Sequence, residues 1–162
     1  MRAEEVFREY HNMKKELSVL EFQLQQFKGV NEDDLITAMC FSHLEGDERV
    51  QTSSLSDKTA KAAINYKMVA EKENDEWYDF LWRRYQYLKE EIDFFEHGVQ
   101  NLDGILADIM TDLLKGDMSW DDIQNQYCIS RMMITRYRKK ALDNLQNLYN
   151  LREQQVADYI LG

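Results

Sequence analysis

Apolar residues near the start of the chain recur at alternating spacings of four and three, from Val6 to Phe27. This is an a/d stripe of three heptads, and it predicts an N-terminal helix that ends near Gly29. Two interpretations are open: the stripe packs against the rest of its own chain, or it joins a second copy in a coiled coil. The stripe positions are Val6, Tyr10, Met13, Leu17, Leu20, Leu24 and Phe27.

The middle of the chain contains a break followed by a long helical pattern. Asn31 is typical of a cap for a short helix that reaches Met39. Residues 43–57 have no apolar period and include a Thr-Ser-Ser cluster, which predicts an exposed loop. Ser56 or Asp57 then begins a helix that we expect to continue to about His97.

Aromatic residues are dense along this long helix, from Trp77 to Phe95. Stacked bases would explain them, but the carboxylates between Glu71 and Asp79 would repel a phosphate backbone. We therefore interpret the aromatic residues as core or helix–helix contacts.

The C-terminal part alternates short apolar helices with capping residues. Gly98 and Gly104 bracket its entry, and a helix from Ile105 to Leu114 ends at Gly116. Ser119 with Asp122 then forms a capping-box pattern that opens a short helix reaching about Gln126.

A tight turn at residues 127–129 follows, and Ser130 caps a longer helix that reaches at least Leu145. A short helix, a three-residue turn and a second helix, with Ile123, Ile129 and Ile134 setting the angle between them, are typical of a helix-turn-helix.

The pattern as a whole predicts an all-α fold, because no segment alternates with period two and the chain has no proline. The predicted organisation has three parts. They are an N-terminal heptad helix with its loop as an oligomerisation region (1–55), a long central helix (56–98) and a C-terminal helix-turn-helix domain that binds DNA (99–162).

Charge changes this picture in two opposing ways. The 162 residues carry a net charge of −10, which by itself argues against a nucleic-acid partner. The segment from Tyr127 to Leu142, however, contains five basic residues and no acidic one. One segment of an acidic chain is therefore locally positive.

The second helix of the predicted pair has two distinct faces. Ile134, Tyr137, Ala141 and Leu145 fall on one face at about 100° per residue. The outward face combines threonine, arginine and lysine near the helix start, as major-groove reading requires. The alternative is an ordinary solvated basic face. The candidate DNA-binding residues are Arg131, Met132, Thr135, Arg136, Lys139 and Lys140.

These residues carry a resemblance to known proteins. The runs Ser119–Ile123 and Ile129–Arg131, with Ile134, Lys140–Leu142 and Leu145, resemble the helix-turn-helix of sigma factor region four. Residues of about 56–149 resemble phage and prophage transcriptional regulators of the RinA/ArpU type. That resemblance is carried by Ser56–Thr59, Ala63 and Asn65–Tyr66 and by the order of the helices.

Gln124 and Cys128 depart from the usual helix-turn-helix pattern, which has a small residue and a glycine at these positions. The resemblance implies a sequence-specific DNA-binding activator of late phage genes.

Three functions compete at this point. The first is a DNA-binding transcriptional regulator whose acidic helical body forms a dimer or contacts RNA polymerase. The second is a packaging protein similar to small terminase subunits, and the third is a protein-interaction module that does not bind DNA. An enzyme is not expected, because no phosphate loop, dinucleotide fingerprint, zinc-protease motif or nucleophile elbow is present.

No cofactor or metal is expected either, since His11, His43 and His97 are scattered. Cys40 and Cys128 are interpreted as reduced, partly buried thiols. The sequence has no stretch of about 20 apolar residues and no leader pattern, so we expect a cytoplasmic protein near the bacterial nucleoid, without a membrane partner. The expected partners are double-stranded DNA and a second copy of the chain.

Overall fold

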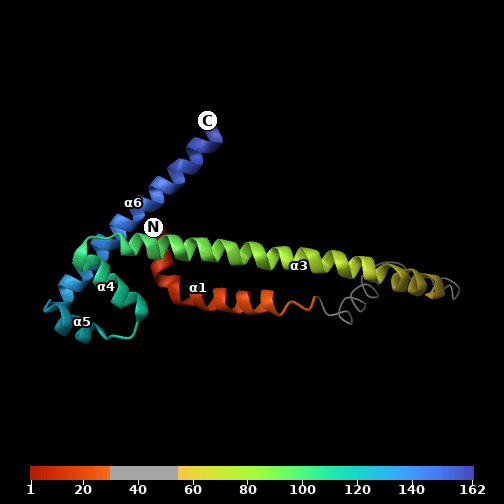
Figure 1. Ribbon diagram of the computed structural model, residues 1–162, viewed down its shortest axis with the longest axis horizontal. Helices are drawn as coiled ribbons and strands as arrows, with labels where there is room; N and C mark the ends of the chain where they lie inside the picture. The colour runs from red at the N-terminus through yellow and green to blue at the C-terminus, as the bar shows by residue number, and fades with distance from the viewer. Residues whose placement is uncertain (30–54) are drawn as a thin grey trace, which may run out of the picture. The chain divides into compact units, whose positions relative to one another are not determined.

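A computed structural model describes residues 1–29 and 55–162, and over 55–68 it describes the backbone alone. Within these residues the chain is helical and forms no strand, as the sequence predicts. Figure 1 shows α4, α5 and the start of α6 gathered at the end of α3. The helices are α1 (Arg2–Gln25), α3 (Leu55–Gln100), α4 (Gly104–Lys115), α5 (Trp120–Tyr127) and α6 (Arg131–Leu161).

The chain divides into two compact units, and α1 and α3 each contribute to both. The first unit comprises residues 1–18 and 86–162, and the second comprises residues 19–85. In the first unit a single core joins the start of α1 to the end of α3, to α4 and to α6. Its largest buried side chains include Phe95, Met110, Leu145 and Tyr149.

The N-terminal stripe packs within its own chain over its first half. Val6 is buried in the core of the first unit, and Tyr10 and Met13 pack against that core. Of the two interpretations of this stripe, the structure therefore shows intrachain packing for these three residues. Leu20, in the second unit, is also buried.

Several aromatic side chains of α3 are exposed, contrary to the prediction of core or helix–helix contacts. Trp77, Phe80 and Trp82 are 44%, 57% and 42% exposed. These side chains contact neighbouring rings of the same helix. Trp77 stacks with Phe80, and Trp82 stacks with Tyr85.

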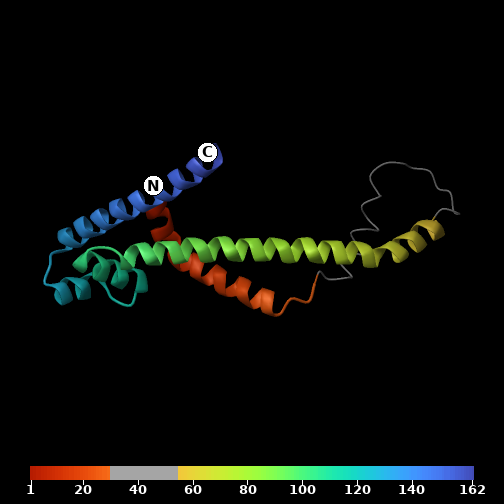
Figure 2. The ribbon, with the colours of Figure 1, turned by 45° about the horizontal axis from the view of Figure 1, so that its top comes forward.

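The long helix is longer than the sequence pattern indicates at both ends. It begins at Leu55, and it passes through Gly98 to end at Gln100. Gly98 is therefore not a break: a Cβ atom there would lie 2.7 Å from Cδ2 of Leu145. The glycine lets α3 and α6 approach closely, and Figure 2 shows the first half of α6 lying beside the end of α3. The predicted short helix near Asn31 and most of the predicted loop lie outside the described residues.

A buried carboxylate connects three helices of the first unit. The Glu91 side chain on α3 is 4% exposed and accepts hydrogen bonds from Arg2 at 3.1 Å and from Arg152 at 2.9 Å. Tyr149 is buried nearby, and burial together with the Glu91 carboxylate raises the pKa of its hydroxyl. Charge pairing within the protein thus replaces the hydration that Glu91 loses on folding.

In the described part of the chain, no helix combines the length and the apolar character needed to cross a bilayer.

Candidate nucleic-acid interface

The helices that carry the predicted site are fixed at their ends by local hydrogen bonds. α4 ends where Gly116 adopts a left-handed conformation with φ of 69°. α5 begins with a complete capping box. The Ser119 hydroxyl accepts from the Asp122 amide at 3.2 Å, and the Asp122 carboxylate accepts from the Ser119 amide at 2.9 Å. Ser130 caps α6 by accepting from the amide of Met133. These three predicted helix boundaries are confirmed.

The capping box makes a testable contribution at acid pH. Hydrogen bonds from the Ser119 hydroxyl and amide lower the pKa of the Asp122 carboxyl. Because the folded pKa lies below the unfolded value of about 3.9, this group stabilises the fold above that value. The stabilisation is lost as the pH falls through the folded pKa. Asp122→Asn is therefore expected to show a smaller loss of stability than the parent between about pH 5 and pH 2.

Urea midpoints measured by circular dichroism across this pH range would test the effect. Asp121→Asn is the matched control, because Asp121 lies in the same exposed first turn and does not contact Ser119 in the box. Equal acid profiles for Asp122→Asn and the parent would mean that the box does not form in solution.

The turn between α5 and α6 uses a residue in a conformation that favours glycine. Cys128 has φ of 53° and ends α5, with its amide donating to the carbonyl of Gln124. A side chain in this left-handed region costs about 1–2 kcal/mol. Cys128 lies exposed in this turn, so the prediction of a partly buried thiol is wrong for this residue.

A second contact ties the end of α5 to α4. The Tyr127 hydroxyl donates to the Asp112 carboxylate at 2.6 Å. Partial burial and this acceptor raise the pKa of Tyr127 to about 12. Tyr127 therefore stays protonated and bound to α4 at neutral pH.

Three isoleucines set the arrangement of α4, α5 and the start of α6. Ile109 of α4, Ile123 of α5 and Ile134 of α6 are each fully buried and form one cluster. Ile129 from the turn packs against them. Each helix thus places a β-branched side chain in the common centre, and these stiff side chains limit how α5 can turn relative to α6.

The six candidate DNA-binding residues all lie exposed on the first three turns of α6. Met132 is 66% exposed. The Thr135 hydroxyl donates to the carbonyl of Arg131, and the Arg131 guanidinium lies 5.9 Å from the Trp120 ring. The structure therefore brings the six residues together on one accessible surface of α6.

One basic residue of this segment has a different place. The Arg138 guanidinium lies 4.9 Å from the ring of Phe7 and packs against α1. Its half-buried position sets it apart from the exposed cations of the same helix. Sequence periodicity could not identify Phe7 as its partner, because the two residues are far apart in the chain.

Comparison with protein-family models, curated proteins and solved structures finds no match to this chain. The resemblance to RinA/ArpU-type regulators therefore stays a prediction from the residues that carry it. Among the described residues, no group of three or more His, Cys, Asp or Glu side chains is placed to hold a metal ion.

Proposed function

We propose that the chain is a sequence-specific DNA-binding transcriptional regulator in which α5 and α6 act as a helix-turn-helix. One observation carries the proposal: the start of α6 is seated on a buried isoleucine cluster while its outer surface presents threonine, arginine and lysine. A helix held in this way can enter the major groove of DNA without a change in the fold. The major groove is wide enough to admit an α-helix. The resemblance to phage regulators makes late phage genes the proposed target.

The side chains divide by the kind of contact that they can make. Arg136 lies opposite the buried face, about one and a half turns after the Ser130 cap, where a recognition helix meets base edges. Its guanidinium can donate two hydrogen bonds to a guanine. Lys140 lies further along the exposed side and suits a phosphate contact. Arg136 is therefore proposed to read sequence, and Lys140 to contribute affinity.

A second function is favoured by the net charge of −10. An acidic protein repels DNA beyond its one basic surface, and a protein partner would avoid this penalty. Under this alternative, the basic surface of α6 would bind an acidic protein and DNA binding would be absent even at low salt.

Arg136→Ala is expected to lose about 1–3 kcal/mol of discrimination between target and random DNA. Its thermal midpoint should change little, because an exposed guanidinium contributes little stability. Lys140→Ala is expected to weaken binding to all sequences about equally and to reduce the salt slope by about one unit. Both are measured by fluorescence anisotropy on a motif selected from a random DNA pool.

Lys89→Ala supplies the matched control, because Lys89 is exposed on α3 and pairs with Asp93 at 3.6 Å. This variant also loses one positive charge but should retain the discrimination of the parent. If Arg136→Ala binds the selected motif as tightly and as selectively as the parent, α6 does not read the major groove. The protein-interaction alternative would then be favoured.

A further inference from the structure

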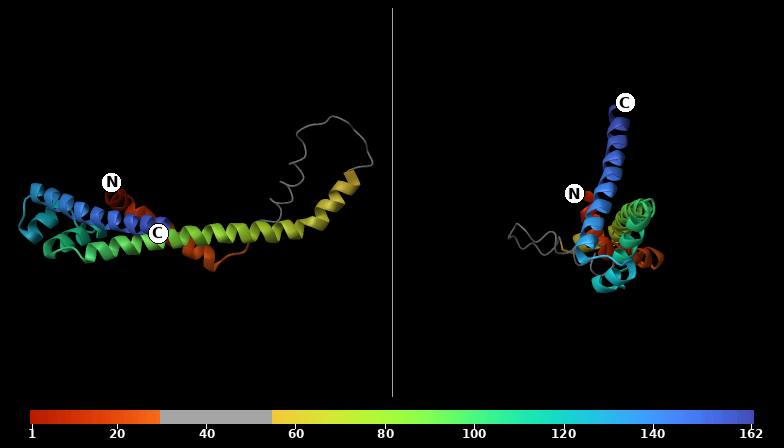
Figure 3. Two further views of the ribbon diagram at one scale, coloured as in Figure 1. Left: turned by 90° about the horizontal axis from the view of Figure 1, so that it is seen from above. Right: turned by 90° about the vertical axis from the view of Figure 1, so that its left-hand side faces the viewer.

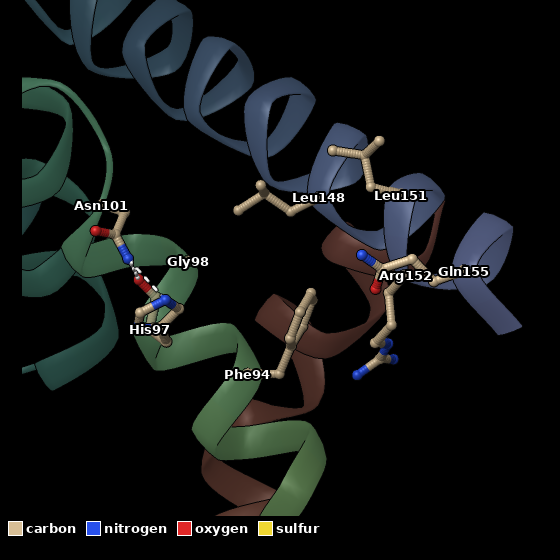
Figure 4. A pocket seen from close by; sticks show the side chains of 8 residues that line it. All are labelled: Phe94, His97, Gly98, Asn101, Leu148, Leu151, Arg152 and Gln155. Carbon is tan, nitrogen blue, oxygen red and sulfur yellow. Dashed lines mark hydrogen bonds between the residues drawn. The ribbon is translucent and has the colours of Figure 1, made fainter.

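An apolar groove lies between the end of α3 and the second half of α6, within the first unit. Figure 4 shows Phe94 facing Leu148 and Leu151 across it, with Gly98 at its inner end. Its volume is about 440 Å³. Arg152 fixes one side, since its guanidinium lies 4.3 Å from the Phe94 ring and pairs with Glu91 at 2.9 Å. Contacts with Phe94 and Glu91 therefore hold the Arg152 side chain at the rim of the groove.

The same helix continues past the groove with an unusual apolar content. Leu151, Val156 and Tyr159 are 56%, 54% and 88% exposed, and Ile160 is 72% exposed. Figure 1 and the right-hand view of Figure 3 show the last turns of α6 extending away from the other helices of the first unit. Helical spacing places Leu148, Leu151, Gln155 and Tyr159 along one side of α6, so the apolar wall of the groove continues into this extension.

We infer that the groove and the last turns of α6 form a two-fold interface with a second copy of this chain. In an antiparallel pair of α6 helices centred on Gln155, Tyr159 of one copy reaches the level of Leu151 of the other. The exposed helix end of each copy then covers the groove of its partner. A two-fold contact must be self-complementary, and this segment supplies both the groove and the helix that fills it.

The groove suits an apolar helix face better than an acidic or basic one, because the Arg152 guanidinium at its rim already pairs with Glu91 at 2.9 Å. The extension carries Glu153 and Asp158, whereas the groove rim carries Arg152 and His97. The antiparallel register brings Asp158 of one copy to the level of Arg152 of the other. The two residues lie on opposite flanks of the contact at this level, so the apolar side chains of Leu151 and Tyr159 meet between them.

The expected interface is small, which sets the expected affinity. Residues 150–161 span roughly 18 Å of helix. Such a contact falls at the low end of interface sizes, which is typical of weak or transient association. This inference does not depend on DNA binding, and its tests contain no DNA, so either proposal can fail alone.

Sedimentation equilibrium of the full chain, from about 1 to about 200 µM, would measure the monomer–dimer equilibrium. Tyr159→Glu places a charge on the apolar side of the extension and should raise the dissociation constant at least about tenfold. Ala157→Glu adds the same charge on the opposite side of α6 and should leave the constant within about twofold. Circular dichroism would show that both variants keep their helix content.

Cross-linking gives a second measurement of the register. In a Cys40→Ser/Cys128→Ser background, Gln155→Cys should oxidise to a disulfide-linked dimer at least about tenfold faster than Ala157→Cys, because only residue 155 lies at the two-fold axis. A monomer at all concentrations would overturn the inference. A dimer insensitive to Tyr159→Glu, or equal cross-linking at positions 155 and 157, would also overturn it.

Discussion

Arg2→Ala combined with Arg152→Ala is expected to lower the free energy of unfolding by about 3–5 kcal/mol. The Glu91 side chain is only 4% exposed, and these two arginines are its hydrogen-bonding partners at 3.1 and 2.9 Å. Removing both leaves an ionised carboxylate in a buried position, where the loss of hydration is no longer compensated. Glu91→Gln should cost less, roughly 1–3 kcal/mol, because the arginine side chains are 34% exposed and can reach water.

The decisive measurement combines these changes. Adding Glu91→Gln to the double alanine variant should raise its stability, although the same change lowers the stability of the parent. The effect of Glu91→Gln on the free energy of unfolding should reverse its sign only if a buried unpaired charge destabilises the double alanine variant. Loss of the packing of Arg152 on Phe94 would not produce this reversal. Urea unfolding at pH 7 would measure all four proteins. A further loss on adding Glu91→Gln would contradict this account of Glu91.

Local capping motifs allowed several helix boundaries to be predicted from the sequence. The Ser119–Asp122 box, the Ser130 cap and the left-handed Gly116 each depend on residues within three or four positions of one another. Such signals are visible in one sequence because the hydrogen bonds that they describe are local. The all-helical class follows from the same patterns and is confirmed over the described residues.

Contacts between distant residues could not be read in the same way. Arg2 and Glu91 are 89 positions apart, and nothing near either residue indicates the other. The sequence places Gly98 at the entry to the C-terminal part, but it does not show that this glycine lies inside α3 and admits the Leu145 side chain. The exposed rings of Trp77 and Phe80 illustrate a similar limit, since aromatic density does not show which face of a helix finds a partner.

The candidate site was partly readable for the same physical reasons. Helical periodicity placed Thr135, Arg136 and Lys139 away from Ile134, and the structure finds them exposed. The buried cluster that packs beneath these residues could not be predicted in full from the sequence. Ile109 comes from α4, and only the folded chain shows that it completes the cluster with Ile123 and Ile134. What this surface binds stays a prediction, because exposure and charge describe a surface without identifying its partner.

Ile123→Ala is expected to lower the free energy of unfolding by about 2–5 kcal/mol, because it opens a cavity in the fully buried cluster that joins α4, α5 and α6. Ile123→Val should cost only about 0.5–1.5 kcal/mol, so the loss should grow with the volume removed. Met132→Ala serves as the control. Met132 lies on α6 but is 66% exposed, and its replacement should change stability by less than about 0.5 kcal/mol.

The two alanine variants should also distinguish a residue that stabilises the helices beneath the surface of α6 from a residue that contacts DNA directly. If α6 binds DNA, Ile123→Ala should lose affinity only in proportion to its unfolded fraction, so lowering the temperature should restore binding. Met132→Ala should stay folded, and any loss of affinity should persist at every temperature. Calorimetric melts and anisotropy titrations on the same samples would compare these outcomes. A stable Ile123→Ala protein would show that α5 is not seated on α4 and α6, and the basis for a rigid recognition surface would be lost.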